Sequence, residues 1–201
     1  MEGNQSAYYG QYYIPLQNLE QEILQWLRKL VDAYAKQAGE TPVEHIRSRI
    51  KTAEGMQEKL HKKGFETTAD SALANVSDIV GFRLVTHFVG EVYDIVERMK
   101  QDGTFRVVKE KDYIANPKPN GYRSLHLTIR LPVFFAEKEI HVPVEIQLRT
   151  IAMDFWASLE HTIRYKKNLP INAEVETELK ECADSSREWD SKMEHLLHIL
   201  T

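Results

Sequence analysis

Apolar and polar residues alternate strictly along two neighbouring segments in the second half of the chain. The apolar positions of the first segment are Leu125, Leu127, Ile129, Leu131, Val133 and Phe135. Those of the second segment are Ile140, Val142, Val144, Ile146 and Leu148. Because successive side chains of a strand leave opposite faces, this spacing predicts two strands that each bury one face. We expect the two strands to pair as an antiparallel hairpin.

The polar face of this predicted hairpin carries a distinctive set of side chains. The set consists of Tyr122, Ser124, His126, Arg130, Glu145, Gln147 and Arg149. A face that only meets water more often shows lysine, glutamate and threonine. An aromatic ring, an imidazole, a carboxylate, an amide and guanidiniums on one rigid surface are instead typical of a functional site.

A further helix is expected from Thr41 to Gly64. Thr41 would cap it, Pro42 would take its first position, and Glu44 would complete a capping box. Its buried stripe would consist of Ile46, Ile50, Ala53, Met56 and Leu60. Around that stripe it would carry Arg47, Arg49, Lys51, Lys59, Lys62 and Lys63. Such residues usually form a solvated face, but they could also form a basic wall that binds a polyphosphate through charge-assisted hydrogen bonds.

Apolar spacing of three to four residues predicts the other helices. They cover approximately residues 15–38, 68–76, 92–99, 150–167 and 175–200. Strands are expected at 82–88 and 104–110, and a loop at 112–120. These elements predict an α+β fold with a mixed sheet of about five strands, the hairpin at its centre and helices on its flanks. We expect one domain over residues 1–201, with a core at about 40–170 and long terminal helices within 1–39 and 172–201.

The last two predicted helices each have an apolar stripe. In the helix at 150–167 the stripe consists of Ile151, Phe155, Leu159 and Ile163. The final helix has a seam of alternating four- and three-residue steps through Val175, Leu179, Cys182, Ser186, Trp189, Met193, Leu196 and Leu200. Such a seam more often packs on another helix of its own fold than forms a free coiled coil. For the assembly, the seam is a plausible contact between copies of the chain, and packing on the first helix of the same copy is the alternative.

Composition and charge narrow the class of protein. The 201 residues are 42% hydrophobic and 28% charged, as is usual for a globular domain. A net charge of −4 argues against a general surface for duplex nucleic acid, but it permits a local cationic pocket. One cysteine, no apolar run of membrane-spanning length and no signal-peptide pattern predict a cytoplasmic protein. The histidines lack the close spacing of a structural zinc site.

Two carboxylates are candidates for chemistry. Asp78 lies at the expected start of a strand, where it could bind a hard cation such as Mg2+, although a turn former or helix cap is the simpler interpretation. Glu145 interrupts the most apolar strand of the chain, so it needs a partner or a task. A structural ion pair with Arg130 or Arg149 is the alternative for Glu145.

A lysine and an aromatic ring flank the turn that precedes the hairpin. Lys118 and Tyr122 stand on either side of Pro119 and Gly121. This segment is either an ordinary turn or a turn that presents a cation and a stacking ring to a nucleotide. Together with the two acids and the basic residues, this turn completes a set that suits phosphoryl-type transfer. Catalysis of that kind is mostly positioning, charge neutralisation and removal of one proton.

Four stretches resemble, in order, motifs of the RelA/SpoT-type alarmone synthetase domain. They are residues 77–83, 118–126, 144–150 and 151–161. The last one is similar to the continuation found in the small alarmone synthetases, and among these to the RelP branch. The likeness covers about residues 40–170. Full-length relatives also carry hydrolase and regulatory domains, for which this chain has no room.

The resemblance implies a nucleotidyltransferase-like fold and a defined reaction. The β,γ-pyrophosphate of ATP would move to the 3′-hydroxyl of GDP or GTP, giving ppGpp or pppGpp and AMP. By motif position, Asp78 would bind Mg2+, and Glu145 would be the general base and share the metal. On the ATP side the resemblance implies adenine contacts from Arg49 and Arg83 and phosphate contacts from Lys51 and Lys59. On the GDP or GTP side it implies Tyr122 stacked on guanine, with Lys118, His126, Gln147, Lys111 and Asp154 around it.

The family resemblance also implies a homotetramer, and it leaves other functions open. Gly55 departs from the family pattern, in which a serine is usual, and this removes a hydroxyl from the phosphate side. One alternative function is pyrophosphate transfer to tRNA or adenine nucleotides, which would favour a basic acceptor mouth. Another is a non-catalytic nucleotide- or RNA-binding module, which would tolerate the loss of Asp78 or Glu145.

Overall fold

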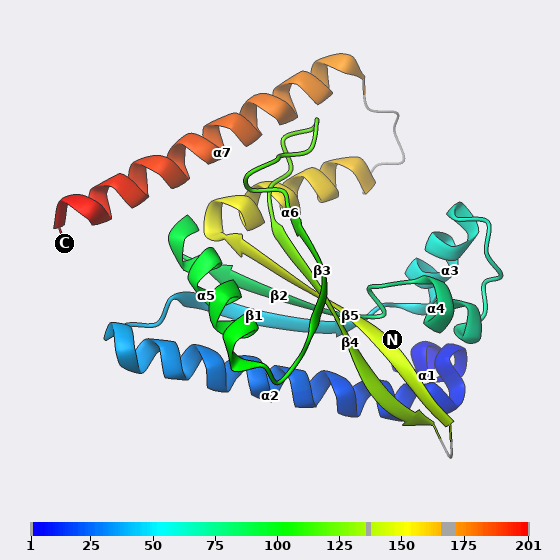
Figure 1. The fold of residues 1–201 in the computed structure, drawn as a ribbon. Helices are drawn as coiled ribbons and strands as arrows, with labels where there is room; N and C mark the ends of the chain where they lie inside the picture. The colour runs from blue at the N-terminus through cyan, green and yellow to red at the C-terminus, as the bar shows by residue number, and fades with distance from the viewer. Residues whose placement is uncertain (1, 136–137, 166–171, 201) are drawn as a thin grey trace.

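The structure is a computed structural model that describes residues 2–135, 138–165 and 172–200. In this part of the chain the strands form a mixed sheet in the order β1-β2-β5-β4-β3 (Figure 1). The strands are β1 (Val43–Ile50), β2 (Val80–Thr86), β3 (Val107–Asp112), β4 (Leu125–Phe135) and β5 (Lys138–Thr150). Strand β2 runs parallel to β5, and the other neighbours are antiparallel. The predicted α+β class, the mixed sheet and the central hairpin are therefore confirmed.

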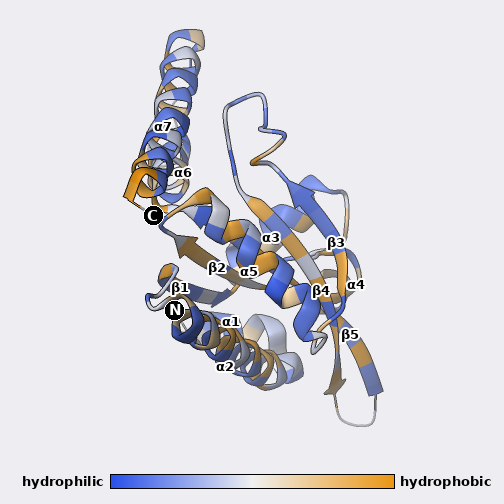
Figure 2. Ribbon diagram, turned by 60° about the vertical axis from the view of Figure 1, so that its left-hand side comes forward, coloured by the Kyte–Doolittle hydropathy of each residue, from blue (hydrophilic) through white to orange (hydrophobic). Residues whose placement is uncertain are grey.

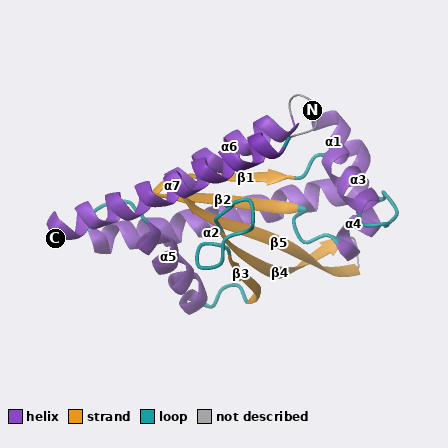
Figure 3. Ribbon diagram, turned by 90° about the horizontal axis from the view of Figure 1, so that it is seen from above, coloured by secondary structure: helices purple, strands orange, loops and turns teal. Residues whose placement is uncertain are grey.

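Helices cover one face of this sheet and frame the other. They are α1 (Glu2–Tyr9), the short 3-10 helix η1 (Gly10–Tyr12), α2 (Tyr13–Ala38), α3 (Ala53–Lys62), α4 (Ala69–Asn75), α5 (Val89–Asp102), α6 (Ile151–Tyr165) and α7 (Ala173–Leu200). Helices α2 and α5 pack against the same side of the strands. Figure 3 views the opposite side, where α6 and α7 lie along one side and α3 and α4 lie at one end.

The hydrophobic core lies between the sheet and α2. Leu127 of β4 pairs with Ile146 of β5, and Leu84 of β2 continues the same layer. These side chains and Leu16 and Leu27 of α2 are completely buried. Figure 2 shows hydrophobic and hydrophilic residues alternating along the strands and separating into two sides of α2. The two faces predicted for the hairpin are thus the two faces observed.

Most of the other predicted elements form close to their expected places. The helices expected at 15–38, 68–76, 92–99 and 150–167 are α2, α4, α5 and α6, although residues 166–167 lie outside the described residues. Helix α2 ends at Gly39, whose φ of 86° favours a glycine. Strand β2 ends before Phe88, which caps α5 instead, and β3 begins later than predicted, at Val107. None of the described helices combines the length and the apolar character that a membrane crossing needs.

The helix predicted from Thr41 to Gly64 is wrong in its first half. Residues 43–50 form β1, an edge strand that pairs antiparallel with β2. Helix α3 starts only at Ala53, and its true cap is Thr52, whose Oγ1 accepts a hydrogen bond from Gly55 N at 3.2 Å. An edge strand shows an incomplete apolar alternation, so the local pattern resembled a helix start. Pairing with β2 overrides that local preference.

The apolar stripe of α6 and most of the apolar residues of the α7 seam are exposed. On α6, Ile151, Phe155, Leu159 and Ile163 are between 46% and 66% exposed. On α7, Leu179 is buried, but Trp189 is 67% exposed and Met193 is 51% exposed. The alternative in which this seam packs on the first helix is therefore wrong. In the described residues α7 instead lies beside α6, on the other side of the sheet from α2 (Figure 1).

Candidate active site

The open face of the sheet gathers the predicted polar residues on three adjacent strands. In register, His126 of β4 lies beside Gln147 of β5, and Gln147 lies beside Arg83 of β2. Glu145 stands two residues before Gln147, next to Gly81 of β2. The intervening residues are those of the buried core, so the pleat alone fixes this polar face.

The Glu145 carboxylate is held by two neighbours. Its Oε2 accepts a hydrogen bond from Gln147 Nε2 at 2.7 Å, and its Oε1 lies 3.4 Å from His126 Nδ1. Burial favours a raised pKa for Glu145, but the interactions with His126 and Gln147 outweigh it and lower the pKa. The predicted alternative, an ion pair with Arg130 or Arg149, is not among the ion pairs of the described residues. Glu145 is therefore an ionised group with about a fifth of its side chain, 22%, open to solvent.

Asp78 is also ionised, and two lysines compensate its charge. Asp78 Oδ1 lies 2.7 Å from Lys59 Nζ, and Oδ2 lies 3.2 Å from Lys51 Nζ. Burial opposes ionisation, but the two ammonium groups lower the pKa of the Asp78 carboxyl below its ordinary value. The Tyr9 hydroxyl donates to the backbone oxygen of Lys51 at 2.8 Å and so fixes the connection that carries this lysine. Asp78 thus has partners that a simple turn former would not need.

The two carboxylates interact electrostatically. Asp78 acts electrostatically on Glu145, whose pKa it raises against the effect of His126. No group of three His, Cys, Asp or Glu residues is placed for a metal in the described part of the chain. A pair of carboxylates nevertheless suits Mg2+, which takes one or two carboxylates together with phosphate oxygens and water. The donor set therefore fits a nucleotide-bound Mg2+ rather than a structural metal.

The six basic residues predicted for one helix come from different elements. Arg47 and Arg49 lie on β1, Lys51 lies in the connection after it, and Lys59 lies on α3. Lys62 is paired with Glu58 on the exposed side of α3, and Lys63 is the exposed residue at its end. The predicted basic wall is therefore built from the edge strand β1, the connection after it and α3. Of its residues, Lys51 and Lys59 contact Asp78.

Arginine side chains crowd the middle of the open face. Arg83 Nη1 lies 3.0 Å from Asp154 Oδ1. Burial, and then repulsion from Arg149 and Arg49, lowers the pKa of Arg83. Only Asp154 among these neighbours compensates the positive charge in the described chain. The region therefore has an excess of positive charge next to the two acids, which favours a polyanionic ligand.

A second cluster at the other end of the site is aromatic. Lys118 Nζ lies 4.6 Å from the ring centroid of Tyr122 and 4.8 Å from that of Tyr113. The Tyr122 hydroxyl lies 2.9 Å from His126 Nε2, and Lys111 is the register partner of His126. Tyr113 was not predicted as a site residue, because it begins a loop and belongs to no alternating pattern.

Arg149 connects these groups, although the sequence suggested for it only a place on the polar face or an ion pair with Glu145. It is buried and donates to Tyr122 Oη at 2.6 Å, to Gln147 Oε1 at 3.1 Å and to Asp154 Oδ1 at 3.2 Å. Its Nε also donates to Ser124 Oγ at 3.3 Å. A single guanidinium therefore orients the aromatic ring, the amide and the carboxylate. Its fork of donors explains why an arginine is needed there.

Gly55 lies in the first turn of α3, close to Lys51. A Cβ at this position would lie 3.1 Å from Thr52 Oγ1, so a larger residue would require the cap to shift slightly. A groove with a volume of about 690 Å3 lies elsewhere, between α2 and α5, with Trp26 and Arg98 in its walls. It lacks the carboxylate pair and the aromatic cluster, so the open face of the sheet remains the candidate site.

Comparisons with known proteins place these residues in context. Residues 48–169 match the family described as "Region found in RelA / SpoT proteins". Two relatives from Bacillus subtilis (strain 168) are GTP pyrophosphokinase YwaC and GTP pyrophosphokinase YjbM. YwaC is 47% identical over 77% of this chain and 74% of its own length, and YjbM is 30% identical over 92% and 86%.

Solved structures of similar proteins have the same fold. Small alarmone synthetase 1 from Bacillus subtilis, bound to its product pppGpp, matches with a TM-score of 0.85 and 29% identity, over 94% of this chain and 96% of its own. Small alarmone synthetase 2 from the same organism matches with a TM-score of 0.80 and 39% identity, over 92% and 96%.

The balance of forces on Glu145 gives the first prediction. In the variant His126→Leu the hydrogen-bonding ring is lost, so burial and repulsion from Asp78 act on Glu145 with less opposition. We expect its pKa to lie below the ordinary value of a glutamate in the unmodified protein and to rise in the variant. A carbon-13 NMR titration of the Glu145 side-chain carboxyl measures the pKa in the unmodified protein and in the variant. The control is His141→Leu on the exposed part of β5, and an equal shift in both variants would contradict the role of His126.

Proposed function

The chain belongs to the RelA/SpoT family, and we propose that it is a GTP pyrophosphokinase that makes (p)ppGpp on the open face of its sheet. The observation that carries the proposal is the pair of ionised carboxylates, Asp78 and Glu145, between a lysine-rich end and an aromatic end. The donor would be ATP, the acceptor GDP or GTP, and the released product AMP. We expect this reaction in the cytoplasm, where a chain with one cysteine remains reduced.

The lysine-rich end suits the ATP donor. Lys51 and Lys59, which now compensate Asp78, would also compensate the phosphates, while Arg49 and Arg83 would enclose the adenine. Mg2+ would be held by Asp78 and Glu145 and would neutralise charge on the transferring phosphates. Planar guanidiniums stack well on aromatic bases, which supports this division of labour between arginines and lysines.

The aromatic end suits the guanine nucleotide. The Tyr122 ring would stack on the base, and Lys118 next to it would contact phosphate. His126 contacts this ring directly, and Gln147 and Asp154 are linked to it through Arg149. Lys111 lies beside His126 on β3. With donor and acceptor at opposite ends, Glu145 stands between them.

The transfer is a displacement at the β-phosphorus of ATP. The 3′-oxygen of the acceptor forms a bond to this phosphorus, the bond to the oxygen shared with the α-phosphate breaks, and AMP leaves with that oxygen. Glu145 would accept the proton of the 3′-hydroxyl. Its lowered pKa keeps the carboxylate ionised at neutral pH and therefore ready for this step.

The exposed apolar stripes of α6 and α7 support a homo-oligomer, and a tetramer is the state we propose. Phe155 is 66% exposed and Trp189 is 67% exposed, each within a row of exposed apolar residues on its helix. Continuous apolar rows of this kind commonly mark protein interfaces. Copies of the same chain are the natural occupants, because most soluble oligomers are symmetric assemblies of one chain.

Replacement of the proposed base is the second prediction. Glu145→Gln should slow formation of (p)ppGpp and AMP by about 100-fold or more, because proton removal is lost while the shape remains. Product is measured by chromatography with GDP, GTP, AMP and tRNA as parallel acceptors, each with and without Mg2+. Glu139→Gln, an exposed carboxylate on the same strand, is the control. Near-normal turnover of Glu145→Gln with an intact fold would remove Glu145 from this role.

Removal of the stacking ring is the third prediction. Tyr122→Ala should raise the KM for GDP or GTP by about tenfold or more and leave the KM for ATP nearly unchanged, because a stacked base contributes about 1–3 kcal/mol. The control Tyr122→Phe keeps the ring but removes the hydroxyl that accepts from Arg149. Equal losses for both nucleotides in the alanine variant would argue against stacking.

Disruption of the exposed stripes is the fourth prediction. Trp189→Glu and Phe155→Glu should each shift the protein to smaller species in light scattering at a fixed concentration, because each places a charge inside an apolar contact. Ile14→Glu, on an exposed position of α2, is the control. A monomeric unmodified protein, or no shift in either variant, would contradict the assembly.

A further inference from the structure

Helix α7 contributes no residue to the proposed site, yet one of its faces contacts the loop that carries Lys118 and Tyr122. This face consists of Leu179, Ala183, Ser186, Asp190 and Glu194. Steps of three and four residues put these positions on one side of a helix. The exposed apolar residues of α7 lie on its remaining surface.

The first contact is a close approach to Gly121. This glycine has a φ of 87°, and a Cβ on it would overlap the Cβ of Ala183 and lie 3.2 Å from Lys180 Cδ. The neighbouring Tyr122 packs with Ala183, Trp156 and Ala157 in one small apolar cluster. The turn next to the stacking ring is therefore shaped directly against α7.

The second contact is a buried ion pair. Arg123 Nη2 lies 2.8 Å from Asp190 Oδ2, and the two side chains are only 6% and 5% exposed. Arg123 Nη2 also donates to Ser186 Oγ at 3.3 Å. Arg123 directly follows Tyr122, so the position of Arg123 helps to fix the backbone from which the Tyr122 ring extends. Breaking such a buried pair is costly, because the remaining charge has no water to compensate it.

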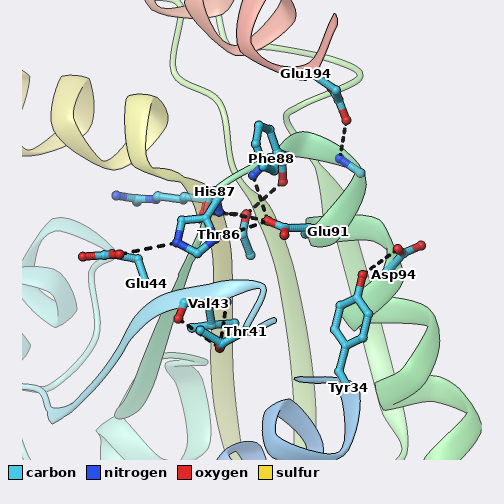
Figure 4. Close-up of polar contacts among 12 residues, drawn as sticks. Tyr34, Thr41, Val43, Glu44, Thr86, His87, Phe88, Glu91, Asp94 and Glu194 are labelled. Atoms are coloured by element: carbon cyan, nitrogen blue, oxygen red, sulfur yellow. Dashed lines mark hydrogen bonds and ion pairs between the residues drawn. The ribbon is translucent and has the colours of Figure 1, made fainter. Parts of the chain in front are cut away.

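Further contacts fix α7 itself to the fold. Trp156 Nε1 donates to Leu179 O at 2.8 Å, and Ser186 Oγ donates to Ala152 O at 3.0 Å. At the far end, Glu194 Oε1 accepts from Gly90 N, at the start of α5, at 2.8 Å (Figure 4). Helix α7 is thus fastened to α6 and to α5, and it can serve as a rigid support.

The backbone of the loop at residues 118–123 has little support from the rest of the described chain. It belongs to no strand, and its backbone hydrogen bonds are internal, from Lys118 N to Tyr122 O and from Gly121 N to Lys118 O. Asn120 adds one contact to Glu160 of α6. A loop without such external contacts loses conformational entropy on binding a ligand, which weakens affinity.

From these contacts we infer that α7 positions the acceptor-binding loop, with Asp190 acting through Arg123 as a positioning residue for Tyr122 and Lys118. The inference rests on the proposed function only for the identity of the ligand. The preformed loop presents the ring and the ammonium group without an ordering cost, so the acceptor, and not the donor, gains affinity.

Amidation of the buried carboxylate tests the inference. Asp190→Asn should raise the KM for GDP and GTP by about tenfold, change the KM for ATP by less than about twofold, and leave Gly121 and Tyr122 amides faster to exchange with deuterium. Glu188→Gln, which removes an exposed carboxylate from the same helix, is the control. Arg123→Lys, which keeps the charge, should lose less acceptor affinity than Arg123→Met.

A purely structural role of Asp190 would give a different result. It would lower kcat through a smaller folded fraction, leave both KM values unchanged and accelerate exchange throughout α7. That pattern, or unchanged acceptor KM and loop exchange, overturns the inference. If Asp190→Asn does not fold, the double variant Arg123→Met with Asp190→Leu removes both charges. The KM values and the amide exchange of the loop then decide in the same way. An unmodified protein that makes no product would refute the proposed function, while loop exchange would still test the support by α7.

Discussion

The alternation of side chains along β4 and β5 is the constraint on which the site depends. The same two strands bury Leu127 and Ile146 on one face and present His126 and Glu145 on the other. A shift of one residue in their pairing would move the apolar set into water and bury the carboxylate in the core. Core packing on α2 therefore fixes the position of the catalytic candidates as firmly as it fixes the fold.

Charge compensation decides what this surface can do. Asp78 is ionised because two lysines surround it, whereas Glu145 is ionised because an imidazole and an amide contact it. The first arrangement places two cations where phosphates would arrive. The second leaves a carboxylate that can accept a proton, since its partners are weaker than a lysine or an arginine. Similar groups thus acquire separate roles through their neighbours.

Regular side-chain periods predict the elements that carry the candidate site, whereas elements that depend on contacts between distant segments are not predicted from the sequence. The hairpin, α2 and α5 have complete periodic patterns, and all three form as predicted. The segment at 41–64 has a helix-like start, but pairing with β2 turns its first half into β1. Arg149 was predicted only as a polar-face residue or an ion-pair partner of Glu145, because its role depends on four partners brought together by folding.

The final helix also shows that contacts between distant segments decide what the sequence pattern does not predict. Its predicted seam meets the fold only at Leu179 and Ser186, and Ala183 and Asp190 lie on the same face. Small and polar residues allow a close approach and a specific ion pair, whereas Trp189 and Met193, further along the helix, remain exposed. A copy of the chain bound to these exposed residues would also contact α7. Assembly and acceptor binding would then depend on the same helix.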